Sequence, residues 1–167
     1  HEFGSESLPI NYRLAAEMYE QSTILGSLSA KFRLGLLFLE GDGVSQDVDY
    51  SLSLIEGAAK EGLEEAYSFL GWAYQNGYYV RQDIEVAMSF YRAAAEHGDV
   101  DGQYQLSVLL RQSEKYEAID EGKFWLEEAA KADHSEAQFE LSLSLASHDS
   151  EEDRIKAVEW AKLSANS

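Results

Sequence analysis

The sequence repeats itself with a period of about 36 residues. Glycine or aspartate stands at four equivalent positions, Gly26, Gly62, Gly98 and Asp133, and an alanine-rich segment precedes three of them. A fixed period of this length indicates that each unit is one supersecondary element that stacks on its neighbours. The fold is therefore expected to be a linear array of similar units.

A second pattern recurs in each unit, and the spacing of its apolar residues is that of a helix. In the second unit it reads Ala66-x-Ser68-x-Leu70-Gly71, followed by Ala73 and Tyr74. Apolar residues separated by four, three and one positions share one helical face and do not alternate as in a strand. A small residue follows the central leucine in every unit, and its recurrence predicts a close approach between the two helices of a pair. These small residues are Gly35, Gly71, Ser107 and Ser142.

The links between the two halves of a unit carry helix-ending and helix-starting residues. Glycines in residues 40–47 and 75–83 are expected to end the first helix in the left-handed conformation, and Asp47 and Asp83 are expected to cap the next one. Gly26, Gly62 and Gly98 are expected to end the second helix in the same way. Asp133 replaces that glycine in the third unit, and residues 112–115 replace its glycine-rich link, so these two connections are predicted to be less regular.

These motifs together resemble the Sel1-like repeat family, a relative of the tetratricopeptide repeat, over residues 6–167. The resemblance implies an all-α, right-handed α/α superhelical solenoid of antiparallel helix pairs, and the repeat frame gives about nine helices. Residues 1–5 resemble an expression-tag remnant. The remainder divides into an orphan helix, residues 6–27, and four pairs at about 28–63, 64–99, 100–134 and 135–167. The last pair ends at Ser167 without a polar capping helix, so we expect a fragment of a longer protein.

Composition narrows the range of partners. Thirteen basic and thirty-one acidic residues give a net charge of −18, which repels nucleic acid and anionic membranes and attracts basic surfaces. The same charge serves equally well to keep an extended protein in solution. No run of eighteen apolar residues is present, so no direct membrane insertion is expected. The chain has no cysteine and therefore no disulfide, and nothing in the sequence assigns a compartment.

Motifs for catalysis or metal binding are incomplete. Residues 41–46 begin like a dinucleotide-binding loop but lack its third glycine and its preceding strand. Residues 99–102 resemble the start of a calcium loop, but Leu110 stands where the bidentate glutamate is needed. The histidines His97, His134 and His148 fall in three different connections near predicted helix ends. We therefore predict no enzyme activity, no cofactor and no metal site.

A row of side chains on the first helices is the predicted binding surface. In repeats of this family the first helix of each pair lines the concave face, and the third and sixth residues after its first alanine share one side. Leucine, tryptophan and valine in this row indicate either an apolar binding surface or packing against the next repeat. Two tyrosines of the longest link are a second candidate. The predicted partner-binding residues are Arg33, Leu36, Phe69, Trp72, Gln105, Val108, Glu140, Leu143, Tyr78 and Tyr79.

The predicted function is that of a non-catalytic adaptor or scaffold that binds a partner protein or peptide in its concave groove. It follows from the repeat architecture that the resemblance implies and from the row of side chains. The alternative is an immunity-type or inhibitor protein that occludes a basic toxin or enzyme, and it follows from the charge of −18.

Overall fold

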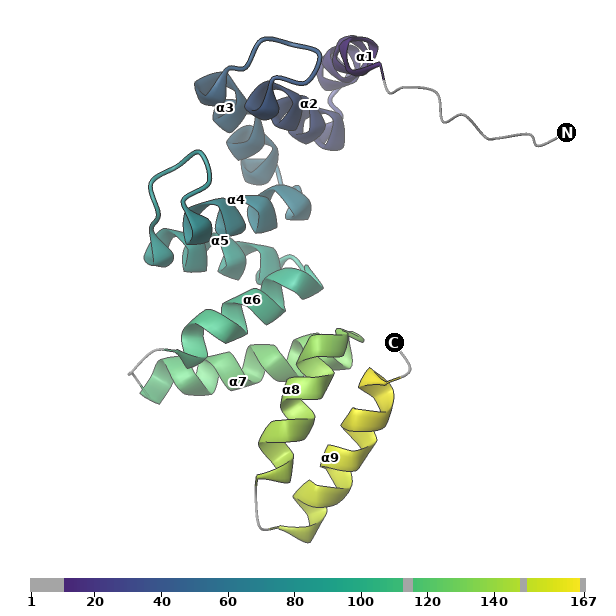
Figure 1. Ribbon diagram of the computed structural model, residues 1–167, viewed down its shortest axis with the longest axis vertical. Coiled ribbons are helices and arrows are strands. Elements are labelled where there is room, and N and C mark those ends of the chain that lie inside the picture. The colour runs from purple at the N-terminus through teal and green to yellow at the C-terminus, as the bar shows by residue number, and fades with distance from the viewer. Residues whose placement is uncertain (1–10, 113–115, 148–149, 166–167) are drawn as a thin grey trace, which may run out of the picture. The chain divides into compact units, whose positions relative to one another are not determined.

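The computed structural model describes residues 11–112, 116–147 and 150–165. These residues form nine helices and no strand (Figure 1), which confirms the all-α fold class. The predicted tag remnant, residues 1–5, lies outside the described residues. The chain divides into two compact units, residues 1–66 and 67–167. The helices are α1 (Tyr12–Ile24), α2 (Leu28–Glu40), α3 (Val48–Lys60), α4 (Glu64–Asn76), α5 (Ile84–Glu96), α6 (Val100–Arg111), α7 (Tyr116–Lys131), α8 (Ser135–Ala146) and α9 (Glu151–Ser164).

The predicted aspartate caps are present. The Asp47 carboxylate accepts a hydrogen bond from the Tyr50 amide at 3.0 Å, and the Asp83 carboxylate accepts one from the Val86 amide at 3.1 Å. Both aspartates have extended backbones, as an N-cap residue requires. The caps therefore fix the first residues of α3 and α5 where the sequence placed them.

The turns between successive helix pairs use the left-handed conformation, as predicted for Gly26, Gly62 and Gly98. Gly62 has φ +99°, and its amide and that of Leu63 donate to the last turn of α3. Asp133 also adopts this conformation, with φ +65°, and its amide and that of His134 make the equivalent bonds to α7. The prediction of a less regular turn at Asp133 is therefore wrong. Aspartate is among the few residues with a side chain that tolerate this region. The predicted irregularity of residues 113–115 lies outside the described residues.

Small residues allow the two helices of a pair to approach closely, as predicted. A Cβ atom added to Gly35 would lie 2.7 Å from the Ile55 side chain. The fully buried Ser51 hydroxyl donates to the Gly35 carbonyl at 2.7 Å, so α2 and α3 meet there through the backbone. In the second unit a Cβ atom on Gly71 would lie 2.7 Å from the Tyr91 ring.

Each unit has its own apolar core. In the first unit Ala16, Leu34 and Leu37 are buried, and Val44 of the α2–α3 link packs against them. In the second unit one cluster joins α5 to α6, and another joins α7 to α8 and α9. Helices α8 and α9 lie side by side (Figure 1). Helices therefore pack mainly on those adjacent in sequence, as a stacked array requires.

We predict that Leu70→Ala destabilises the protein by about 2–5 kcal/mol, because the Leu70 side chain is completely buried and its truncation leaves a cavity. Urea unfolding followed by circular dichroism measures the change. Leu143→Ala is the matched control, since Leu143 is 56% exposed, and it should change stability by no more than about 0.5 kcal/mol. Equal stabilities of the Leu70 variant and the wild type would contradict the repeat frame.

Candidate functional site

The predicted row divides into exposed and half-buried members. Arg33 in the first unit is exposed, and so are Trp72 and Leu143 in the second, at 43% and 56%. Leu36 and Val108 are half-buried, which fits the packing alternative for these two better than it fits a binding role. The other half-buried members are Phe69, Gln105 and Glu140.

Phe69 and Trp72 of the row meet Tyr78 and Tyr79 of the following link. The Trp72 ring centroid lies 4.8 Å from that of Tyr78 and 6.0 Å from that of Phe69, and the two tyrosine rings are 4.6 Å apart. These four residues are called the aromatic cluster below. Two candidate surfaces that the sequence left separate are therefore one surface on the second unit.

The link geometry explains why the tyrosines return to α4. Gly77 takes a left-handed conformation with φ +70°, and the Tyr78 amide donates to the Ala73 carbonyl at 2.9 Å. Tyr79 is also left-handed, with φ +57°, a conformation that is uncommon for a large side chain. The Asp83 amide donates to the Tyr74 carbonyl at 2.9 Å and fixes the far end of the link. The chain is thus turned back and held against the helix end.

Ring packing preorganises this cluster for contact. Aromatic pairs at these separations stabilise each other by roughly 0.5–1.5 kcal/mol beyond their buried area. The Asn76 side-chain amide also donates to the Trp72 carbonyl at 2.8 Å, and this hydrogen bond stabilises the last turn of α4. Trp72 therefore presents an exposed indole whose orientation its neighbours already limit.

Near its C-terminal end the predicted row contains an acidic residue, Glu140, that makes contacts within the fold. The Glu140 carboxylate accepts a hydrogen bond from the Tyr104 hydroxyl at 2.9 Å and forms an ion pair with Arg111. Burial raises the pKa of the Tyr104 hydroxyl to about 12, and the neighbouring Glu140 carboxylate adds to the shift. Glu140 thus links α8 to α6. The large exposed apolar side chains on α8 are Phe139 and Leu143, one helical turn apart.

His97, His134 and Asp99 have structural contacts at helix ends. His97 lies at the end of α5 with Nδ1 2.8 Å from the Ala93 carbonyl oxygen, and His134 caps α8 by accepting from the Ala137 amide at 3.2 Å. Asp99 caps α6 by accepting from the Gly102 amide, so residues 99–102 form a helix-to-helix turn, as the sequence indicated. His148 lies outside the described residues.

Searches for metal-binding and membrane-spanning features cover the described ranges only. Within them, no three or more histidine, aspartate or glutamate side chains gather closely enough to hold a metal ion. None of the helices in these ranges combines the length and the apolar character needed to cross a bilayer.

An α-helical array of 36-residue pairs with an exposed aromatic cluster defines a helical-repeat protein of the solenoid class. Models of the Sel1 repeat match residues 1–27, 28–63, 64–99, 100–134 and 135–167. The chain belongs to the Sel1 repeat family. Sel1 repeat proteins generally mediate protein–protein interactions, and they are typically non-catalytic.

One curated relative is similar along most of this chain. It is chitin synthase regulatory factor 4 of Schizosaccharomyces pombe, which is 31% identical over 146 residues. The match covers 85% of this chain but only 23% of the relative, so the chain spans less than a quarter of that protein.

Solved structures support the fold. A protective antigen of uropathogenic Escherichia coli, described as having this repeat fold, matches with a TM-score of 0.76 and 28% identity, over 93% of this chain and 34% of its own. A Sel1 repeat protein from Oxalobacter formigenes matches with a TM-score of 0.75 and 24% identity, over 93% and 63%. An immunity protein from Pseudomonas aeruginosa matches with a TM-score of 0.59 over 95% and 59%, and at 19% identity it shows the fold alone.

We predict that Trp72→Ala and Gly71→Leu affect stability differently, although the residues are adjacent. Trp72→Ala should destabilise by about 0.5–1 kcal/mol, because it removes the ring contacts of a side chain that is 43% exposed and lies outside the core. Gly71→Leu should destabilise by about 1–3 kcal/mol, because its side chain meets the Tyr91 ring. Thermal and urea unfolding measure both. A larger loss for Trp72→Ala than for Gly71→Leu would place the indole in the core.

Proposed function

We propose that this chain is a non-catalytic adaptor or scaffold that binds a partner protein or peptide through the row of first-helix side chains, with the aromatic cluster as its main anchor. The exposure of Trp72 within a set of packed rings is the observation that carries the proposal. Tryptophan and tyrosine are enriched among residues that dominate binding energy. Rings that are already held in place lose little conformational freedom on binding, which favours affinity.

The family and the curated relative support the same mode of action. The relative is named a regulatory factor of chitin synthase, and such a name fits a protein that acts through another protein. This chain spans only 23% of that relative, so only the mode of action is carried over and not its target. The remaining row members, Arg33, Leu36, Gln105, Val108, Glu140 and Leu143, are proposed as flanking contacts.

We predict that a Trp72→Ala, Tyr79→Ala double variant binds its partner more weakly while remaining folded. Partners are captured from a native lysate with the wild type, identified by mass spectrometry, purified, and measured by calorimetry. Loss of a central aromatic anchor should weaken binding by about 2 kcal/mol or more, which is roughly thirtyfold in Kd. Phe124→Ala is the matched control, because Phe124 is an exposed aromatic residue on α7, outside the row. Equal Kd values for the double variant and the wild type would refute the assignment of the anchor.

The charge of −18 favours a second candidate, an immunity-type or inhibitor protein that occludes a basic toxin or enzyme. An acidic surface steers a basic partner and accelerates its association, and salt screens this effect. The structural likeness to an immunity protein is a likeness of fold and adds no support to this candidate.

Salt dependence separates the two candidates. We predict that the association rate of a captured partner changes by less than about threefold between 20 and 300 mM salt, because apolar anchors dominate the adaptor mode. Stopped-flow measurement of association tests this. A fall of tenfold or more would favour the inhibitor.

A further inference from the structure

The outer face of α9 carries two exposed apolar side chains, Ile155 and Val158. Both line a shallow groove of about 530 Å³ that is formed by residues of α9 alone. The opposite face of α9 packs on α8 (Figure 1), where Ala157 is buried and Trp160 lies against the core that joins α7 to α8. The outer face therefore belongs to a helix that the fold holds in place, and it lies outside the predicted row and the aromatic cluster.

Packing within a helix pair does not explain the isoleucine on this face. Ile155 stands two residues before Ala157, whose place in the repeat is that of Ser51 in α3. The other three described pairs have an acidic residue at the position of Ile155: Asp49, Glu85 and Asp120. The repeat thus tolerates a charged side chain here, and the exposed isoleucine calls for a separate explanation.

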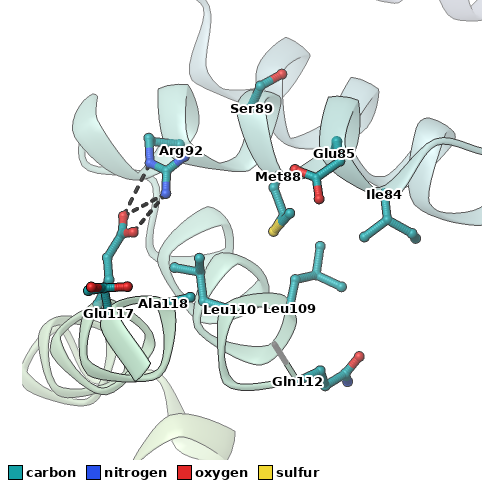
Figure 2. A pocket seen from close by; sticks show the side chains of 11 residues that line it. Ile84, Glu85, Met88, Ser89, Arg92, Leu109, Leu110, Gln112, Glu117 and Ala118 are labelled. Atoms are coloured by element: carbon teal, nitrogen blue, oxygen red, sulfur yellow. Dashed lines mark hydrogen bonds and ion pairs between the residues drawn. The ribbon is translucent and has the colours of Figure 1, made fainter. Parts of the chain in front are cut away.

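The equivalent face of α5 shows how such a face is covered inside the array. Val158 and Lys162 correspond to Met88 and Arg92, 70 positions earlier. Met88 packs against the cluster of α5 and α6, and the Arg92 guanidinium donates to both carboxylate oxygens of Glu121 on α7, at 2.7 and 2.8 Å (Figure 2). An apolar contact and a cation paired with a carboxylate of another helix therefore cover this face of α5.

The outer face of α9 has the spacing of a helix-pairing seam. Glu151, Ile155, Val158 and Lys162 are separated by four, three and four residues, as in the contact positions of a coiled coil. If two copies of α9 pair antiparallel, Ile155 of each copy lies opposite Val158 of the other, and Glu151 lies opposite Lys162. Parallel pairing would instead place glutamate opposite glutamate and lysine opposite lysine. The seam is thus complementary to itself in the antiparallel direction only.

We propose that the outer face of α9 binds the same face of a second copy of this chain, forming an antiparallel two-fold dimer. Two-fold dimers, in which both copies use one patch, are the commonest oligomers. The groove is lined by two acidic and two basic side chains, whereas the whole chain carries a charge of −18, so two copies repel each other less here. The Lys162 ammonium has three N–H donors, and a contact within its own chain leaves donors for the second copy.

The dimer should be weak, because one pair of helices buries less area than a standard interface of about 1,600 Å², and we expect a Kd of the order of 100 µM. Sedimentation equilibrium of the whole chain between about 10 µM and 1 mM measures it, at about 300 mM salt so that repulsion between the two negative copies is screened. A chain that stays monomeric throughout this range would overturn the proposal.

Charge reversals test the antiparallel arrangement. Glu151→Lys and Lys162→Glu should each weaken dimerisation about tenfold or more, because each turns two attractive contacts of the two-fold dimer into repulsive ones. Glu151→Lys also lowers the net negative charge, so an effect of total charge would strengthen dimerisation instead. An equal mixture of the two single variants should form a heterodimer, because every introduced charge then faces the opposite sign. Absence of that heterodimer would overturn the arrangement.

Ile155→Asp tests the apolar part of the seam without disturbing the pair. Aspartate is the residue that α7 has at this position, Asp120, so the fold should tolerate it, and dimerisation should be lost. Phe124→Glu is the matched control, because Phe124 is an exposed apolar residue on α7 and its equivalent in α9 is Glu159. The control adds the same charge and should leave the Kd within about twofold of the wild type.

Equal weakening by Ile155→Asp and Phe124→Glu would show that the association is not specific to α9, and the proposed interface would be wrong. Thermal melting followed by circular dichroism confirms that each variant is folded. The substituted α9 residues are absent from the predicted row, so the dimer and the partner-binding function can fail independently of each other.

Discussion

Close backbone contact between the two helices of a pair is the constraint on which each unit depends. At Gly35 the helices α2 and α3 approach until the buried Ser51 hydroxyl reaches the Gly35 carbonyl at 2.7 Å. At Gly71 the Tyr91 ring occupies the space that a side chain would need. The third pair keeps the contact with glycine on the other helix, since a Cβ atom on Gly122 would lie 2.7 Å from Arg111. Small residues therefore stand on both helices at each of these contacts: Gly35 and Ser51, Gly71 and Ala87, and Ser107 and Gly122.

Once the pairs are fixed in this way, the links become free to differ. The α4–α5 link has seven residues, and its left-handed Gly77 and Tyr79 return two tyrosines to the end of α4. The α2–α3 link has the same length and instead buries Val44. The helical scaffold is thus repeated, while the chemistry presented at the ends of the helices changes from pair to pair. This separation lets one architecture present an aromatic surface at one link and bury an apolar side chain at another.

Features set by local chemistry could be predicted from the sequence, and features set by contacts between segments could not. The caps at Asp47 and Asp83 and the small residue at Gly71 depend on a single helix end or a recurring position, so the repeat reveals them. The turn at Asp133 was mispredicted because replacing glycine suggested a loss of the left-handed conformation, which aspartate also adopts. The contact between Trp72 and Tyr78 depends on the path of the α4–α5 link, and the sequence indicated that path only through Gly77.

The negative charge takes on a more specific meaning when it is placed on the structure. Several acidic residues are already used within the fold: Glu121 pairs with Arg92, Glu140 pairs with Arg111, and Asp99 caps α6. Partly exposed ion pairs of this kind contribute little stability individually, so they do not by themselves explain an excess of eighteen negative charges. The remaining excess of negative charge attracts basic surfaces, which is the role that the second candidate function would use.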